Sequence, residues 1–306
     1  MIGYIVRRLL IMVPVMIGVS FLSFLILHLV PGNPAVIMAG VGASAADIHH
    51  IEIELGLNHT LLYQYGVFLG HLVRGDLGRS ISTSRPVVQE LAERLPVTVA
   101  LAVAGTVLAI LLGLGLGLVA AARPGRGLDL ASGVVTLFGL SMPSFWLGLM
   151  LILVFAVKLP WFPVAGWNGF SSIVLPAITL GSPGIAVVAR MSRRSLIDAM
   201  GSDYIRTARA KGLGEAKVFI RHALKNALIP VITVVGVEFG TLLGGAVITE
   251  DVFAIPGAGR LIVSAINARD YPTVEGVILV VSMLFVLVNL ATDILYTVVD
   301  PRIHYS

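Results

Sequence analysis

Residues 9–30, LLIMVPVMIGVSFLSFLILHLV, form a run of 22 residues without an aspartate, glutamate, lysine or arginine. A helix needs about 20 apolar residues to cross the roughly 30 Å hydrocarbon core of a bilayer. The apolar region of a signal peptide is shorter, about 7–15 residues, and leads to a small-residue cleavage site, which is not evident here. We therefore expect residues 9–30 to form a retained transmembrane helix.

The rest of the chain repeats this pattern. Of its 306 residues 57% are hydrophobic and 12% are charged, whereas about a quarter of an ordinary soluble domain is charged. Five further runs can cross a bilayer and carry at most one charge each: 97–122, 130–157, 170–189, 226–249 and 276–299. The sequence thus predicts an all-α membrane protein with six transmembrane helices. The absence of cysteine excludes disulfides and thiolate metal sites.

The placement of lysine and arginine predicts the orientation, because these residues favour cytoplasmic loops. With a cytoplasmic N-terminus, 14 of the 21 lie inside and the other seven are spread over longer outer loops. We expect both termini in the cytoplasm. The expected segments are the N-terminus with the first span (1–30), an extracytoplasmic segment (31–96), a five-helix core (97–299) with a cytoplasmic loop (190–227), and a cytoplasmic tail (300–306).

The extracytoplasmic segment is expected to contain short helices and turns. It opens with the turn PGNP (31–34). A short helix over 45–55 can be capped by Ser44, and another is expected over 85–94. The glycines of GDLGRS (75–80) indicate a loop between them.

Residues 204–230, YIRTARAKGLGEAKVFIRHALKNALIP, concentrate positive charge in an otherwise apolar chain. Ser202 or Asp203 can cap a helix over 204–211, and Gly212 can end it in the left-handed conformation. After Gly214 a second helix is expected over 215–226. Anionic lipid binding or simple topogenic charge would also explain the basic residues, but neither explains the tight GLG corner. We call residues 204–226 the elbow; its form suits docking in a partner's groove.

The chain carries no phosphate-binding loop of the type Gly-x-x-x-x-Gly-Lys-Ser/Thr and no His-Glu-x-x-His metal motif. The neighbouring His49 and His50 lie in a polar segment and are expected to be solvated, so no metal site is expected. Any energy for work must therefore come from a partner or an ion gradient.

Glu238 lies near the middle of the fifth span, where an ionised side chain is costly and does not face lipid. It shares a helix face with Thr241, and both residues are candidates for a substrate pathway. The alternative is that Glu238 has a structural role and pairs with a residue of another helix. A stripe of glycines every four residues lies on a different face and allows close helix packing, internally or with a second subunit: Gly236, Gly240 and Gly244. Asp293, in the last span, is expected to bond with Asn289.

The third span contains SMPSFW (141–146), which places a proline in mid-helix beside small hydroxyls and an aromatic pair. Either a substrate pathway or a simple kink explains it. The pathway candidates here are Ser141, Met142, Ser144 and Phe145.

Several of these motifs, taken together and in order, resemble the permease subunits of ABC importers, in the branch that carries dipeptides, oligopeptides and nickel. The general permease signature is Glu-Ala-Ala-x-x-x-Gly followed by Leu-Pro. Here Arg206-Thr207-Ala208 stands in place of Glu-Ala-Ala, Gly212 holds the glycine position, and Leu224-Lys225 replaces Leu-Pro, as in that branch. The resemblance covers nearly the whole chain and is closest to the B-type dipeptide permeases: PGNP, GDLGRS, SRPV, SMPSFW, LLGGAVITE, VFAIPGAGRL, RDYP and DPRI all fit.

The resemblance implies a type I ABC importer transmembrane domain in the inner membrane of a prokaryote. It implies a non-catalytic subunit that binds no cofactor itself, with ATP and magnesium bound by partner ATPases, either two cytoplasmic subunits or one fused chain. A second homologous permease, an extracytoplasmic substrate-binding protein and the lipid bilayer would be its other partners; no nucleic acid is implied. The elbow would be the coupling helix, through Arg206, Thr207, Ala208, Arg209, Ala210, Lys211, Gly212, Leu213, Gly214 and Glu215.

The function expected is therefore ATP-driven import of dipeptides or oligopeptides by alternating access. The same machinery could carry nickel or glutathione. A gradient-driven secondary transporter or channel is the alternative from another class, although the inverted repeats common in such carriers are not evident. A membrane scaffold without transport would fit the hydropathy but not the glycine corner.

Overall fold

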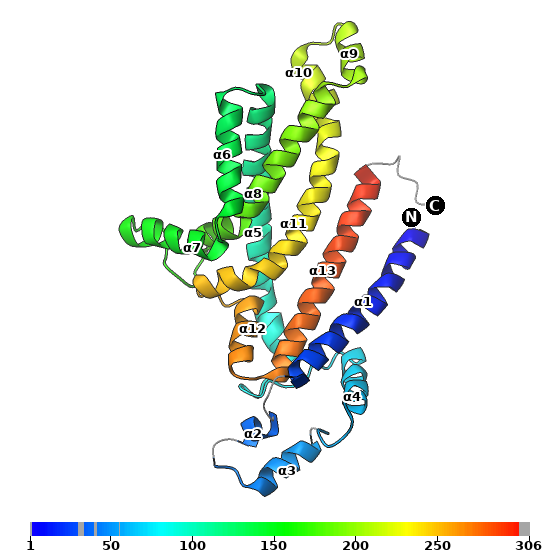
Figure 1. Ribbon diagram of the computed structural model, residues 1–306, viewed down its shortest axis with the longest axis vertical. Helices are drawn as coiled ribbons and strands as arrows, with labels where there is room; N and C mark the ends of the chain where they lie inside the picture. Colours follow the sequence, from blue (N-terminus) through cyan, green and yellow to red (C-terminus); the bar gives the residue numbers. More distant parts are fainter. Residues whose placement is uncertain (1, 30–33, 40–41, 55, 300–306) are drawn as a thin grey trace.

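The computed structural model describes residues 2–29, 34–39, 42–54 and 56–299. Its described residues are almost entirely helical (Figure 1). Five helices are long and apolar enough to cross a membrane: α1 (Ile2–Leu29), α5 (Val87–Ala122), α8 (Ser171–Met200), α11 (Lys225–Val252) and α13 (Tyr271–Val299). The first three residues of the PGNP turn and the tail 300–306 lie outside the described residues.

The third expected span is not one helix. α6 (Gly127–Ser141) and α7 (Ser144–Ile152), which continues as a π-helix η1 (Leu153–Lys158), meet at an angle of 103°. Pro143 precedes α7 and Met142 is extended, with φ −80° and ψ 126°, because a residue before proline avoids the helical region. The span expected over 130–157 is therefore divided into two helices at Pro143. The chain has six spans when this bent pair counts as one.

α9 (Asp203–Ala210) and α10 (Glu215–Lys217) project from one end of the bundle, which we call the inner end (Figure 1). The start of α1 and the end of α13 point toward the same end. The opposite, outer end carries the short helices α2 (Pro34–Ala39), α3 (Ala45–Glu54), α4 (Leu61–Val73) and α12 (Ala258–Asn267). This arrangement agrees with the orientation expected from the basic residues, in which both termini and the elbow are cytoplasmic.

α5 and α8 pack closely because glycines remove the side chains between them. A Cβ on Gly181 of α8 would come within 2.6 Å of the carbonyl oxygen of Gly105 in α5, and one on Gly117 within 2.7 Å of the carbonyl oxygen of Ala189. Such contact between backbones requires small residues at the crossing. The main apolar cluster lies around this pair and includes buried Leu101, Ala177, Leu180, Leu242 and Phe253.

The glycine stripe of α11 faces α13 at two of its three positions. A Cβ on Gly236 would overlap the side chain of Thr292, and one on Gly240 would lie 3.0 Å from the ring of Phe285. Internal packing thus explains these two glycines. Nothing lies within 4 Å of a Cβ placed on Gly244, which is exposed.

α1 is fastened to α13 at the inner end by an ion pair in which Arg8 donates to Asp293 over 2.7 Å. The sequence suggested Asn289, one turn earlier in the same helix, as the partner of Asp293. The ion-pair partner instead comes from a helix that is far away in the sequence.

The outer segment differs from its expected form in two places. The short helix expected over 85–94 is the first part of α5, which runs without a break through Pro96. α4 was not expected; its Tyr65 hydroxyl lies 2.9 Å from the hydroxyl of Ser20 in α1. The cap of α3 is confirmed, because the Ser44 hydroxyl accepts from the amide of Asp47 at 3.2 Å and the Asp47 carboxylate accepts from the amide of Ser44 at 3.0 Å.

Candidate functional site

α9 lies against the inner end of the bundle through one apolar face. Ile205 and Ala208 are buried and pack with Leu196 of α8 and with Val218 and Ala223. Val218 and Ala223 belong to the π-helix η2 (Val218–Leu224), which continues α10 and leads directly into α11. The elbow is therefore seated on two membrane helices at once, so a force applied to it would act on both α8 and α11.

The start of α9 is close to its expected place. Ser202 is the N-cap residue, with extended backbone at φ −78° and ψ 156°. Its hydroxyl does not cap the helix, however; it donates to the carbonyl of Ala199 at 2.5 Å and so joins the end of α8 to the start of α9.

Gly212 ends the first arm of the elbow with φ +77°, so the left-handed termination expected from the sequence is confirmed. Its amide donates to the carbonyl of Arg209 at 2.9 Å. Nothing lies within 4 Å of a Cβ placed there. The requirement for glycine at this position therefore comes from the backbone conformation and not from crowding.

An ion pair that the sequence did not reveal closes the corner. Arg209 donates from Nε to one carboxylate oxygen of Glu215 at 2.8 Å and from Nη2 to the other at 3.2 Å. The hydrogen bond with Glu215 raises the pKa of Arg209. The two-point contact joins the last turn of α9 to the first residue of α10 and so restrains the corner between the two helices.

The ten expected coupling residues divide into a support and a surface. Ala208 is buried and Leu213 is half-buried in the apolar cluster beneath α9. The other eight are exposed: Arg206, Thr207, Arg209, Ala210, Lys211, Gly212, Gly214 and Glu215. These exposed residues form a basic surface in which the glycines also expose the backbone. Such a surface is suited to contact with another protein, and the eight residues do not form a catalytic site.

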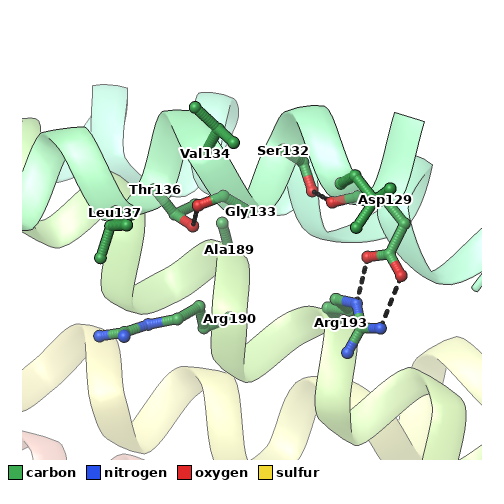
Figure 2. A pocket seen from close by; sticks show the side chains of 10 residues that line it. Asp129, Ser132, Gly133, Val134, Thr136, Leu137, Ala189, Arg190 and Arg193 are labelled. Atoms are coloured by element: carbon green, nitrogen blue, oxygen red, sulfur yellow. Dashed lines mark hydrogen bonds and ion pairs between the residues drawn. The ribbon is translucent and has the colours of Figure 1, made fainter. Parts of the chain in front are cut away.

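A second ion pair fixes the inner end of α6 to α8 (Figure 2). The Arg193 guanidinium donates to the two carboxylate oxygens of Asp129 at 2.5 and 2.7 Å, and the amide of Gly125 donates to the same carboxylate at 2.8 Å. Arg190, one turn before Arg193, points away from this pair (Figure 2). The groove between the two helices is otherwise mainly apolar, with Ser132 and Thr136 directing their hydroxyls to the backbone of α6.

The two pathway candidates on α11 differ in their exposure. Glu238 is half-buried, and a Cβ on Gly184 of α8 would lie 3.7 Å from its carboxylate. Thr241, one turn further, is exposed and donates its hydroxyl to the carbonyl of Val237 at 3.1 Å. Within the described part of the chain, Glu238 has no hydrogen bond or ion pair with another residue.

The pathway candidates in SMPSFW lie at the bend between α6 and α7. Ser141 and Phe145 are exposed, whereas Met142 and Ser144 are half-buried. α7 packs through Gly148 against Thr179 of α8 and Phe253. No hydrogen bond in the described residues joins this group to Glu238.

Two buried carboxylates that the sequence reasoning missed organise the outer end. Asp270 accepts from the hydroxyl of Ser80 at 2.5 Å and from the amides of Ile81 at 3.1 Å and Thr273 at 3.4 Å. It thereby fixes the loop before α5 to the start of α13. A carboxylate in RDYP, beside the apolar α13, was the only signal in the sequence, because its partner Ser80 is 190 residues away.

Glu250, the second of these carboxylates, fixes the start of α12 to α5. It accepts from the hydroxyl of Thr98 in α5 at 2.6 Å and from the amide of Arg260 at 3.0 Å. The Thr98 hydroxyl in turn accepts from the amide of Ala258, the first residue of α12, at 2.8 Å. These bonds satisfy amide groups at the start of α12 that the helix itself cannot satisfy. Among the described residues no group of three or more His, Asp or Glu side chains could hold a metal ion.

Comparison with known families and proteins gives concordant matches along the whole chain. Residues 113–305 match the family described as "Binding-protein-dependent transport system inner membrane component", and residues 1–102 match the corresponding N-terminal family. The dipeptide transport system permease protein DppB of Alkalihalophilus pseudofirmus is 43% identical, with 100% of both chains covered. A putative peptide transport system permease protein of Brucella suis is 44% identical and the glutathione transport system permease protein GsiC of Escherichia coli K12 is 42% identical, with the same coverage.

Solved structures show the same fold at lower identity. The MetNI methionine ABC transporter in an inward-facing conformation gives a TM-score of 0.57 at 20% identity and covers 70% of this chain and 97% of its own. An amino acid ABC transporter crystallised with histidines gives a TM-score of 0.52 at 16% identity, covering 71% and 95%.

Proposed function

Because this chain belongs to the binding-protein-dependent transport system inner membrane component family, it is the permease subunit of an ABC importer, and we propose that it imports short peptides. It is a multi-pass protein of the cytoplasmic membrane and does not itself catalyse a reaction. It works in a complex with an ATPase and a substrate-binding protein.

Peptide import is the substrate class that the relatives favour. Two of those described above are named for dipeptide or peptide transport, and the third for glutathione, which is chemically a modified tripeptide. A peptide backbone is thus common to all three substrates. Nickel transport by the same machinery remains the competing assignment and is decided by the same experiment.

The elbow is the part of this chain through which we propose that the ATPase acts. The packing of α9 supports this proposal. Its exposed surface is basic, whereas its buried face packs in an apolar cluster with α8 and η2, and η2 leads into α11. ATP binding would draw the ATPase subunits together, move the elbow and open the pathway outward. ATP and magnesium would be bound by two ATPase subunits or one fused chain.

A second homologous permease would complete the pathway by facing the open sides of α7 and α11. Exposed apolar side chains on α7 include Phe145 and Trp146. On α11, nothing in this chain lies within 4 Å of a Cβ placed on Gly244. We further assign the outer segment (31–96) to the surface that receives the binding protein, the loop 190–227 to coupling, the remaining core (97–299) to the pathway, and the tail (300–306) to the cytoplasm.

Reconstitution of the complete transporter in proteoliposomes tests this function. With its binding protein outside and ATP available to the ATPase, we expect accumulation of labelled dipeptides that stops when ATP is removed. Accumulation of nickel but not of peptide would overturn the substrate class. Uptake that continues at the same rate without ATP, driven by an ion gradient, would support a secondary carrier instead.

A further inference from the structure

Glu238 is placed at mid-depth in the membrane. It lies halfway along α11, with Lys225 at the inner end and Glu250 and Asp251 at the outer end. At about 1.5 Å per residue its Cα is about 20 Å from either end of the helix. Gly184, which faces it, lies near the middle of α8. The carboxylate is therefore far from both aqueous surfaces.

The chain gives this carboxylate no partner of its own among the described residues. In contrast, Asp129, Glu250 and Asp270 each accept several hydrogen bonds. An ionisable side chain in the middle of a membrane helix costs about 2.5–3.5 kcal/mol on insertion scales and faces a bundle interior or a water-filled cavity. A carboxylate at this depth without a partner in its own chain is therefore a candidate binding site for a cation supplied from outside the chain.

Small residues border Glu238 on two sides. On α8 a Cβ placed on Gly184 would lie 3.7 Å from the carboxylate and 3.2 Å from Ala109 of α5, so the helices pack closely beside Glu238. Along α11 an exposed stripe continues toward the outer end through Thr241, Gly244 and Gly245. The carboxylate is thus bordered by Gly184 on α8 and by a face of small residues along α11.

We propose that Glu238 binds the terminal ammonium group of a peptide as the peptide passes through the permease. This assignment rests on the peptide-import function proposed above. Every unmodified peptide carries this cation whatever its side chains, so one carboxylate serves a broad range of sequences. Pairing the ammonium with a fixed carboxylate offsets the loss of its water in a medium of low dielectric constant.

The test is dipeptide uptake by the complete transporter in proteoliposomes, with Glu238→Gln compared with the unaltered chain. The same binding protein delivers the same peptide in both, so a difference reports the permease alone. We expect the initial uptake rate to fall at least tenfold in Glu238→Gln and to recover partly in Glu238→Asp. Asp251→Asn, which alters an exposed carboxylate on the same helix, is the matched control and should transport normally.

Two further readouts separate this role from others. Assembly of the complex, followed by size-exclusion chromatography, and ATPase stimulation by the binding protein should persist in Glu238→Gln. Unchanged uptake would overturn the assignment, and so would loss of assembly, which would mean that Glu238 pairs with a neighbouring subunit. If the unaltered transporter accumulates no peptide, the proposed function itself fails, and that outcome is visible before any variant is compared.

Discussion

The carboxylate of Asp129 accepts both hydrogen bonds of a two-point contact from the guanidinium of Arg193, at 2.5 and 2.7 Å. The pair joins the first turn of α6 to the inner third of α8, the helix that ends at the elbow. If the elbow moves as proposed, the movement would reach α6 as well as α8. Because the contact is two-pointed and also receives the amide of Gly125, it resists rotation between the two helices.

Loss of this ion pair should weaken both stability and coupling. We expect Arg193→Ala to lower the melting temperature of the purified transporter and the peptide transported per ATP hydrolysed. Asp129→Ala should do the same, and the double variant should fall little further than either single one, because the partners act as a unit. Arg190→Ala removes a neighbouring arginine that points away from Asp129 and is the control. Additive losses in the double variant would show that the pair does not act as one.

Because α5 packs closely on α8, we expect a single added methyl group at their contact to lower the stability of the protein. In Gly117→Ala the new Cβ would lie 2.7 Å from the carbonyl oxygen of Ala189, whereas in Gly115→Ala nothing lies within 4 Å of it. Overpacking typically costs about 1–3 kcal/mol, so only the first variant should lower the midpoint of thermal unfolding. The two variants share a helix and a substitution. Equal midpoints would mean that the helices can separate without cost.

Asp270 should control the order of the outer loop. Replacing it by alanine removes the acceptor of the Ser80 hydroxyl and of the Ile81 amide. A hydrogen bond to a charged group contributes about 1.5–3 kcal/mol, and about 1.4 kcal/mol is a factor of ten. Hydrogen–deuterium exchange over residues 78–86 should therefore quicken at least tenfold in Asp270→Ala. Asp251→Ala, at an exposed carboxylate, should leave exchange there unchanged; protection retained in Asp270→Ala would refute the anchoring role.

The conformation of Gly212 predicts a defect confined to coupling. A side chain at φ +77° strains the backbone by about 1–2 kcal/mol, enough to shift the corner but not to unfold a six-span bundle. Gly212→Val should assemble normally and transport much less peptide per ATP hydrolysed. Gly127→Ala, at an uncrowded glycine of α6 at the same end, should match the unaltered protein. Normal transport by Gly212→Val would exclude a rigid corner as the coupling element.

The sequence predicted the elements whose signal is local. Uncharged runs locate the long helices because lipid requires them, and Gly212 marks the corner because few other residues accept its backbone conformation. A kink at Pro143 was one of two explanations of SMPSFW, but the sequence does not give the angle of 103° between α6 and α7. The continuation of α5 through Pro96 likewise depends on its surroundings and not on the local residues.

Contacts between distant segments could not be predicted. Asp270 binds Ser80, 190 residues earlier, and Glu250 binds Thr98, 152 residues earlier. Glycines of α5 and α8 let the two backbones approach each other, whereas the regular spacing drew attention only to Gly236, Gly240 and Gly244, of which the first two face side chains of α13. Spacing within one helix shows which residues share a face, but it does not show which helix that face meets.

Cross-linking from the elbow to the ATPase tests the central claim most directly. The chain has no cysteine, so Lys211→Cys provides a single thiol on the exposed corner for a photoreactive cross-linker. In the complete transporter we predict capture of the ATPase subunit from Lys211→Cys and not from Asn58→Cys, an exposed position in the outer segment. Capture of the ATPase from position 58, or its absence from position 211 in an assembled and active complex, would contradict the account.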